Sequence, residues 1–372
     1  MSKTANSLTG AVNGNAVSGK TVSGKTVSGI VLAGSYNWSG SSFETLRVRP
    51  LLPVALSPII HRVLDWLDAA AVPDAIICAN GSTAALQRNL GSSYANGLSL
   101  GYHHDGSPRG AGGCVKDAAA QSSSDLFIVT DGTSVPTADI PALLARHVET
   151  GAALTVVAHR RTSPYAAGTQ FSPTGTYVFN RDVLDQIPAT SFHDIKEGLM
   201  PKLYQDGRQI ALFEVASASP RVLNADSYMA LNRWMIERVS AATAPSAGRF
   251  RGLSAHPSAW VDDNAVIVGP VVLGEGARIL SNATLVGPCV IGPGTTVCSQ
   301  ATVARSVVWE NSVIGRDAFV DQCIVGEGAT IDAHESIAGV LRTKTVERRR
   351  FLPRRVKKNE VASGVLARPA LS

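Results

Sequence analysis

The sequence predicts an α/β protein in two parts, a mostly parallel sheet covered by helices and then a triangular β-solenoid. Three observations support this prediction. The chain has 372 residues, which is long for a single compact core. Short apolar segments alternate with amphipathic segments between residues 29 and 240. After residue 252, aliphatic residues recur at every sixth position, a period that neither an α-helix nor a flat sheet produces.

The composition is that of a globular protein. Hydrophobic residues make up 45% of the chain and charged residues 17%, which excludes disorder throughout and a coiled coil. No apolar run reaches the roughly 18 residues of a membrane helix, and the first ten residues lack the apolar core of a secretory signal. The five cysteines are an odd number without a C-x-x-C pair, which favours free thiols. We therefore expect a cytoplasmic protein without a membrane span.

Residues 1–28 form a low-complexity segment with a repeated VSGKT, for which we predict disorder. Gly19–Thr26 satisfies the phosphate-binding pattern G-x-x-x-x-G-K-[ST]. A working loop of this kind needs a strand before it and a helix after it. Here no strand precedes the pattern and a strand-like segment follows it, so the context argues against nucleotide binding by this repeat.

Residues 29–240 alternate predicted strands with predicted helices, which indicates a mostly parallel sheet whose ligands bind at the carboxyl ends of its strands. The predicted strands are Ile30–Ala33, Ala75–Cys78, Leu126–Thr130, Leu154–Ala158, Thr176–Phe179 and Ile210–Glu214. The predicted helices are Ile59–Ala70, Val115–Gln121, Pro141–Thr150, Ile195–Gln205 and Asp226–Val239.

A linker over residues 241–251 precedes the sixfold repeat of residues 252–341. Eight aliphatic residues keep an unbroken register, each preceded two positions earlier by a mostly small residue: Val261, Ile267, Leu273, Ile279, Leu285, Ile291, Val297 and Val303. The register then slips by one residue twice: Val308, Ile314 and Val320, then Val325, Ile331 and Ile337. A triangular solenoid places one such residue on each of its three sides. Residues 342–372 follow as a basic tail. Nine basic residues and two acids stand between Arg342 and Glu360, a net charge of +7 in a chain whose net charge is +5, and the default interpretation of the tail is a solvated segment.

The repeat resembles the hexapeptide-repeat left-handed β-helix family, and the first part resembles sugar-1-phosphate nucleotidyltransferases. Five segments carry the second resemblance. Ile30–Gly34 and Arg49–Val54 are similar to the family's A-G-G-x-G-T-R-L and P-K-P-x-x-P-V, and Pro108–Val115 is similar to P-x-G-T-A-G. Phe127–Thr133 stands where the family has its metal-bearing N-G-D, and Gly175–Phe179 resembles G-I-Y-V-F. The layout is similar to that of mannose-1-phosphate guanylyltransferases.

The resemblance implies a Rossmann-like nucleotidyltransferase domain that converts a sugar 1-phosphate and a nucleoside triphosphate into a nucleotide sugar and pyrophosphate, with Mg²⁺ held by two aspartates. It places Arg49 at the position of the family's lysine. It implies nucleotide contacts for Leu32, Ala33, Gly34, Pro108, Gly110 and Asp131.

The sequence departs from the family where the chemistry occurs. Ser39 stands at the position of the family's arginine, in a loop that carries bulky residues where the family has glycine. Thr133 and Arg221 stand at the positions of the two aspartates. Asp131 is a possible metal contact only if the strand end is shifted by one residue, which would turn its side chain to the opposite face. The segment between Ala158 and Thr176, where the family has a longer sugar-binding hairpin, is short.

These departures favour a catalytically impaired relative that binds a nucleotide or nucleotide sugar and acts as a regulatory or scaffold subunit. Such a protein would form a homo-oligomer or associate with an active paralogue, with no nucleic acid as partner. The alternative is an active guanylyltransferase with a rewired site, which would use Mg²⁺. A hexapeptide acyltransferase with His256 or His334 as its base is less favoured because the repeat carries no long extruded loop.

Overall fold

The computed structural model contains two compact units, Met1–Arg238 and Val239–Ser372. The residues that it describes are 21–34, 46–107, 109–161, 170–242, 250, 252–344 and 349–350. Of the predicted boundaries, the linker over 241–251 lies almost entirely outside these ranges.

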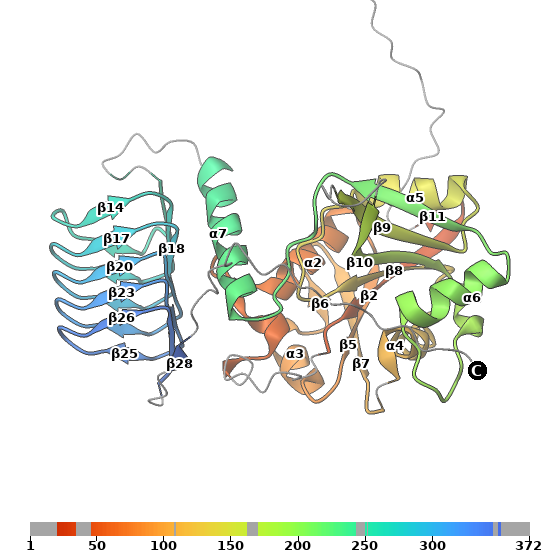
Figure 1. Cartoon of the computed structure of the whole chain (residues 1–372), viewed down its shortest axis with the longest axis horizontal. Coiled ribbons are helices and arrows are strands. Elements are labelled where there is room, and N and C mark those ends of the chain that lie inside the picture. Colours follow the sequence, from red (N-terminus) through yellow and green to blue (C-terminus); the bar gives the residue numbers. More distant parts are fainter. Residues whose placement is uncertain are drawn as a thin grey trace, which may run out of the picture. The chain divides into compact units, whose positions relative to one another are not determined.

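The first unit is built on a mixed sheet, which in the described residues has nine strands (Figure 1). Their order is β11 (Ile210–Val215), β9 (Leu154–Arg161), β10 (Gln170–Asn180), β8 (Leu126–Asp131), β2 (Lys25–Leu32), β5 (Asp74–Ala79), β7 (Leu98–His104) and β6 (Ser93–Tyr94), with β1 (Thr21–Val22) beside β2. The central strands β8, β2, β5 and β7 run parallel, whereas β10 is antiparallel to both of its neighbours. This is the predicted α/β class.

All six predicted strands are present, and the first one begins earlier than expected. The strand β2 starts at Lys25 and pairs with β1 in a hairpin, so part of the predicted disordered segment 1–28 belongs to the sheet. Val27 is fully buried, and Thr26 donates from its backbone N–H and its hydroxyl to Asp125, both at 2.8 Å. These contacts put the G-K-T pattern at the amino end of a strand, which excludes a phosphate-binding loop there.

Helices cover both faces of this sheet. The helices α2 (Ile59–Ala69), α3 (Thr83–Leu90) and α5 (Ile140–Glu149) share one apolar core with the sheet. The other core contains α4 (Gly110–Ala119), the 3₁₀ turn η2 (Arg181–Gln186), the π-helical turn η3 (Ile195–Leu199) and α6 (Met200–Gln205). The smaller elements of this unit are η1 (Arg49–Leu51), β3 (Pro53–Val54) and β4 (Ser57–Pro58), and α7 (Ala225–Ala242) follows the sheet in sequence.

The second unit is a stack of parallel coils with three faces (Figure 1). The first face contains β12 (Leu253–Ala255), β15 (Val271–Leu273), β18 (Cys289–Ile291), β21 (Val307–Val308), β24 (Ile324–Val325), β27 (Val340–Arg342) and the antiparallel β28 (Arg349–Arg350). The second face contains β13 (Trp260–Val261), β16 (Arg278–Ile279), β19 (Thr296–Val297), β22 (Val313–Ile314) and β25 (Thr330–Ile331). The third contains β14 (Val266–Val268), β17 (Thr284–Val286), β20 (Thr302–Ala304), β23 (Phe319–Asp321) and β26 (Ser336–Ala338). This is the predicted left-handed β-helix.

The predicted inward positions form the core of the β-helix. Leu285, Val303 and Val320 stack in successive coils of the third face and are fully buried. From Ala265 to Ala329 the residue two positions before each aliphatic residue is buried as well, as at Ala283 and Ala301. The period of six therefore reflects one inward side chain on each side of a triangular coil, with a small residue at the preceding corner.

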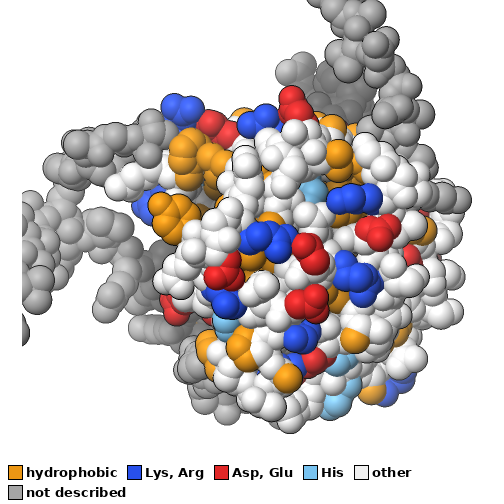
Figure 2. All heavy atoms as spheres, turned by 90° about the vertical axis from the view of Figure 1, so that its right-hand side faces the viewer, with side chains coloured by type: hydrophobic (Ala, Val, Ile, Leu, Met, Phe, Trp, Pro, Cys, Tyr) orange, Lys and Arg blue, Asp and Glu red, His pale blue; other side chains and the backbone are white. Residues whose placement is uncertain are grey.

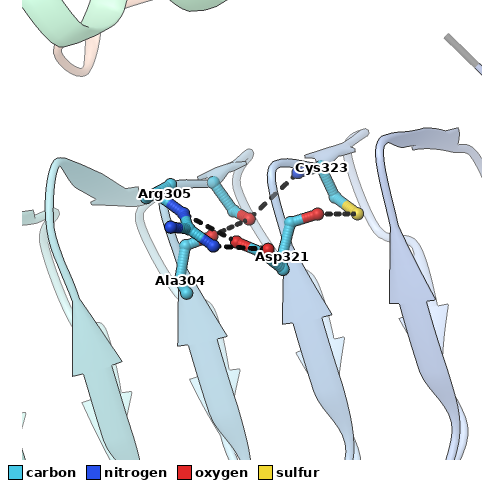
Figure 3. Close-up of polar contacts among 5 residues, drawn as sticks. Ala304, Arg305, Asp321 and Cys323 are labelled. Carbon is cyan, nitrogen blue, oxygen red and sulfur yellow. Dashed lines mark hydrogen bonds and ion pairs between the residues drawn. The ribbon is translucent and has the colours of Figure 1, made fainter. Parts of the chain in front are cut away.

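The register slips have a local cause at the corner between the third and first faces (Figure 3). Val286 pairs with Ala304 before this corner, and Val290 pairs with Val307 after it. The intervening corner is residues 287–289 in one coil and residues 305–306 in the next, which is one residue shorter.

The shorter corner repeats in the following coil, and side chains bridge the two coils there. Cys323 N–H donates to Ser306 Oγ at 3.0 Å, and that hydroxyl donates to the Ala304 carbonyl at 2.6 Å. Arg305 Nε donates to Asp321 Oδ1 at 2.9 Å across the same two coils (Figure 3). These contacts satisfy polar groups that the tighter corner would otherwise leave unpaired.

The surface of the first unit mixes charges of both signs. Figure 2 shows acidic and basic side chains interspersed over the face turned to the viewer. Exposed ion pairs of this unit include Arg160–Glu214 at 2.9 Å and Arg208–Asp182 at 2.6 Å. In the part of the chain that the structure describes, no helix is long and apolar enough to cross a membrane.

Candidate functional site

A cavity of about 270 Å³ lies at the carboxyl ends of β2 and β5. Carboxyl ends of parallel strands are where ligands bind in sheets of this class. Its lining residues come from these strand ends, from α4 and from the segment before η3: Leu32, Gly34, Cys78, Ala79, Asn80, Asp105, Gly110, Ala111, Cys114 and Phe192. Most of these are apolar or glycine, with one carboxylate and one carboxamide, which suits a flat heterocycle with a few polar edge atoms.

Several residues that the resemblance singled out meet at this cavity. Leu32, Gly34 and Gly110 line it. Ala33 lies between the first two but is fully buried, and its N–H donates to the Cys78 carbonyl at 2.7 Å. Pro108 lies outside the described residues. The fold thus brings Gly110 to the same cavity as Leu32 and Gly34, which precede it by more than seventy residues.

The cavity wall at α4 depends on a glycine. Gly110 begins the helix with φ of +82°, and a Cβ built there would lie 2.7 Å from the His193 carbonyl oxygen. That carbonyl accepts from Gly112 N–H at 2.9 Å, and His193 N–H donates to the Arg109 carbonyl at 2.6 Å. The loop is therefore fixed to the start of α4, and Phe192 beside it is 72% exposed at the cavity rim. Sequence reasoning missed Phe192.

Two buried cysteines form part of the apolar wall. Cys78 on β5 and Cys114 on α4 are both free thiols that line the cavity. The hydrogen bond between them, together with burial, raises the pKa of the Cys78 thiol. A protonated buried thiol behaves as a small apolar group, so these residues shape the cavity as a hydrophobic surface.

Asp131 is the last residue of β8 and pairs with Leu32 at the same sheet edge. Val129, two residues earlier, points to the α4 side of the sheet, so Asp131 faces that side as well. This is the side of the cavity, so Asp131 lies on the ligand side of the sheet without a shift of the strand end. One carboxylate oxygen, Oδ1, accepts from the N–H of Thr133 at 2.8 Å and from its hydroxyl at 2.7 Å.

Two arginines come from segments near the end of β8: Arg49, on which the charge of Asp131 acts, and Arg221, whose backbone pairs with the turn after Asp131. Arg49 lies in η1, where partial burial lowers the pKa of its guanidinium and the negative charge of Asp131 raises it. Arg221 is exposed, and its segment pairs with the turn after Asp131. Val135 N–H donates to the Pro220 carbonyl at 2.8 Å and Val222 N–H to the Thr133 carbonyl at 2.9 Å. Ser39, at the lost arginine position, lies outside the described residues.

The residues at the expected metal positions do not fit a Mg²⁺ site made of two aspartates. Mg²⁺ needs oxygen ligands in near-octahedral geometry, commonly carboxylates together with substrate phosphates. Here one oxygen of Asp131 is already occupied by Thr133, and Arg221 brings a positive charge to the second aspartate position. In the described residues no group of three His, Cys, Asp or Glu side chains could hold a metal ion.

The adjacent histidines of β7 are held apart by separate partners. His103 contacts Gln121 at 2.9 Å, and His104 contacts Thr83 on the other face of the sheet at 3.1 Å. On the β-helix, His256 and His334 are exposed; His256 contacts Ser258 at 2.8 Å and His334 lies 3.7 Å from Asp317. His103 and His104 are neighbours on one strand, so their side chains point to opposite faces of the sheet and cannot bind one metal ion together.

Comparisons with known proteins match both units. Residues 267–352 match the family model described as the GMPPB C-terminal domain. Over 253 residues the chain is 26% identical to the mannose-1-phosphate guanylyltransferase of Mycobacterium tuberculosis (strain ATCC 25618 / H37Rv), covering 62% of this chain and 70% of the relative. It is 22% identical over 127 residues to the D-glycero-alpha-D-manno-heptose 1-phosphate guanylyltransferase of Aneurinibacillus thermoaerophilus, covering 34% of this chain and 55% of that relative.

These matches confirm the resemblance predicted from the motifs. The chain is similar to sugar-1-phosphate guanylyltransferases, and its second unit is a parallel β-helix.

Proposed function

We propose that the chain binds a nucleotide or a nucleotide sugar at the carboxyl edge of its sheet, is impaired in nucleotidyl transfer, and acts as a regulatory or scaffold subunit. The observation that carries this proposal is the set of residues at the metal positions. Thr133 occupies an oxygen of Asp131 by hydrogen bonding, and Arg221 replaces a carboxylate by a cation. Nucleotidyl transfer needs cations placed on the reacting phosphates, and a bound metal usually supplies most of that charge.

A second loss adds to the first. The position of the family's arginine is Ser39, which carries no charge. Removal of an arginine that stabilises a phosphoryl-transfer transition state costs about 10³- to 10⁵-fold in rate. Ligand binding is less demanding, because it needs a shaped cavity and a few polar contacts. The chain can therefore bind a ligand in the cavity even though the charged groups that the transfer reaction needs are missing.

The polar groups of the cavity favour guanine among the nucleobases. The Asp105 carboxylate lines the cavity together with Asn80. A carboxylate can accept from two neighbouring N–H donors, which guanine presents at N1 and N2. Adenine presents an unprotonated nitrogen at the same position. The two relatives named above are guanylyltransferases, and a GDP-mannose-like ligand is the corresponding choice for this chain.

Partners are proposed on the apolar outer surface of the β-helix. Val266, Val268 and Phe319 are 48%, 53% and 43% exposed on the third face of the coils. Val266 and Phe319 stand in the same outward column of this face, with Thr284 and Thr302 between them, and exposed apolar side chains on one flat face are typical of an interaction surface. We propose that this face supports a homo-oligomer or association with an active paralogue in the cytoplasm.

The test is pyrophosphate release by the purified protein with Mg²⁺, for the four nucleoside triphosphates and several hexose 1-phosphates including mannose 1-phosphate. Calorimetric titration with GDP-mannose and GTP runs in parallel. We expect binding without turnover. Asp105→Asn should weaken binding of guanine ligands, whereas Asp185→Asn removes the same charge at an exposed position outside the cavity and serves as the matched control.

The alternative function, an active guanylyltransferase with a rewired site, is favoured by one observation. Arg49 keeps a positive charge at the position of the family's lysine, and Asp131, which acts on that charge, pairs with the cavity residue Leu32. Mg²⁺-dependent release of pyrophosphate with any substrate pair would establish that alternative and overturn the proposal of an impaired protein.

A further inference from the structure

The turn after β8 and the segment of residues 220–222 form a rigid pair at the edge of the sheet. Two backbone hydrogen bonds join them, and Ser134 and Arg221 are bridge partners. On the other side of the pair, the Ser134 hydroxyl donates to the Asp131 carbonyl at 2.8 Å. The backbone of Arg221 is thus held at a fixed place next to the carboxyl end of β8.

The side chain of Arg221 remains available for a ligand. It is exposed, and among the residues that the structure describes no carboxylate forms an ion pair with it. The positive charge of Arg221 lowers the pKa of the Tyr177 hydroxyl, which burial raises. Tyr177 is a buried side chain in the core on the α4 side of the sheet. The negative charge of Asp194 raises the pKa of the same hydroxyl. The Asp194 carboxylate caps the following turn, because its Oδ1 accepts from the backbone N–H groups of Lys196 and Glu197 at 2.7 and 3.1 Å.

A phosphate bound at this edge would be repelled by the negative charge of Asp131 unless a cation neutralised that charge. Asp131 lies beside Leu32, a residue of the cavity wall, and repels a phosphate. In relatives that hold a metal ion, the ion would offset such repulsion. Here the charge of Asp131 acts on Arg49, and the backbone bridge between Ser134 and Arg221 brings a second arginine to the turn after β8. Guanidinium groups present parallel N–H donors that match phosphate oxygens.

We infer that Arg221, together with Arg49, neutralises the diphosphate of a bound nucleotide sugar in place of a divalent cation, so that this chain binds its ligand without Mg²⁺. This inference rests on the proposed function, because it specifies how the same site holds the phosphates.

The experiment is calorimetric titration of the full chain with GDP-mannose, GDP and guanosine, each in buffer with Mg²⁺ and in buffer with EDTA. We expect the two diphosphates to bind equally well in both buffers. Arg221→Gln should weaken their binding about ten- to hundredfold, the range for loss of a charge-assisted hydrogen bond, and should leave guanosine binding unchanged. Arg221→Lys keeps the charge and should retain part of the affinity.

Two controls separate a local effect from a general one. Arg146→Gln removes the same charge from an exposed ion pair with Glu149 on α5 and should change no affinity. Far-ultraviolet circular dichroism and the melting temperature check that each variant folds. The double variant Thr133→Asp with Arg221→Asp places two further acids beside Asp131, and its diphosphate binding should become dependent on Mg²⁺.

The outcomes distinguish the inference from the function on which it rests. Wild-type binding that disappears in EDTA would overturn the inference and leave the proposed ligand intact. Binding in EDTA that Arg221→Gln does not weaken would remove the role of that residue. Failure of guanosine, GDP and GDP-mannose to bind in either buffer would overturn the proposed function itself.

Discussion

The two units of this protein preserve their family patterns to very different degrees. In the β-helix each side of each coil places one aliphatic residue in the core, and this pattern holds from Val261 to Ile337. In the first unit the strands and helices are equally intact, but the residues at the carboxyl edge have changed in kind, as at Thr133 and Arg221. The comparison teaches that the folding requirements are met in both units, and the proposal of an impaired protein rests on the residues at the positions expected to hold the metal.

The largest expected effect tests the β-helix. Leu285→Ala removes a fully buried inward side chain and should lower the free energy of unfolding of this unit by about 2–5 kcal/mol. Its neighbour Thr284 points outward on the same strand, and Thr284→Ala should change stability by less than about 0.5 kcal/mol. Chemical denaturation followed by circular dichroism measures both. Equal effects of the two substitutions would contradict the assignment of inward and outward positions.

The next prediction concerns the first unit, in which a histidine is buried. His147 on α5 contacts Thr155 at 2.8 Å, and burial lowers its pKa to about 4. The unfolded chain, with an ordinary pKa near 6.5, therefore binds a proton that the folded chain does not between these values. Stability should be fully present above about pH 6.5 and should fall by about 3 kcal/mol as the pH drops towards 4.

Denaturation at a series of pH values checks this expectation, with His147→Gln as the variant that should flatten the profile. The exposed His256 of the β-helix supplies the control, because His256→Gln should leave the profile unchanged. A wild-type stability that stays constant from pH 7 to 4 would contradict the burial of a neutral His147.

A smaller effect is expected at the start of α4. Gly110→Ala adds a Cβ at positive φ and 2.7 Å from the His193 carbonyl, which should cost about 1–3 kcal/mol and displace the loop that carries Phe192. Gly106→Ala is the matched control, since its Cβ would lie at an ordinary 3.6 Å from the His104 ring. Thermal unfolding measures the loss of stability. The affinity for GDP-mannose measures the displacement of Phe192 at the cavity rim. An unchanged protein would show that the close approach is not required.

The smallest effect sharpens the comparison from the β-helix side. The exposed pair Arg305–Asp321 joins two shortened corners, and surface pairs contribute about 0–1 kcal/mol. A double-mutant cycle with Arg305→Gln and Asp321→Asn should give a coupling within that range and decreasing with salt. A coupling of several kcal/mol would mean that the ion pair, and not the backbone corner, holds the shortened register.

The sequence predicted most of the scaffold because apolar periodicity is a local property. Each inward residue of the β-helix repeats its neighbour's environment, and continuous apolar runs such as Leu126–Thr130 identify buried parallel strands. The strand β7 and the helix α3 were missed because β7 lies near the sheet edge with polar and glycine residues and α3 has only eight residues.

The site was predictable only in part. Leu32, Gly34 and Gly110 could be found from their motifs. Phe192 could not, because its position depends on hydrogen bonds between residues about eighty positions apart in sequence. The contacts of Asp131 could not be predicted, because the hydrogen bonds that its carboxylate accepts from Thr133 depend on where β8 ends, which is fixed only in three dimensions.

The central claim is that the chain keeps the ligand cavity of a guanylyltransferase relative and has lost its metal-assisted chemistry. The most direct measurement is pyrophosphate release from GTP and mannose 1-phosphate by the purified protein in Mg²⁺, with GDP-mannose binding measured on the same preparation in EDTA. We predict no pyrophosphate above the protein-free control and undiminished binding. Mg²⁺-dependent release of pyrophosphate, with binding that vanishes in EDTA, would contradict the claim.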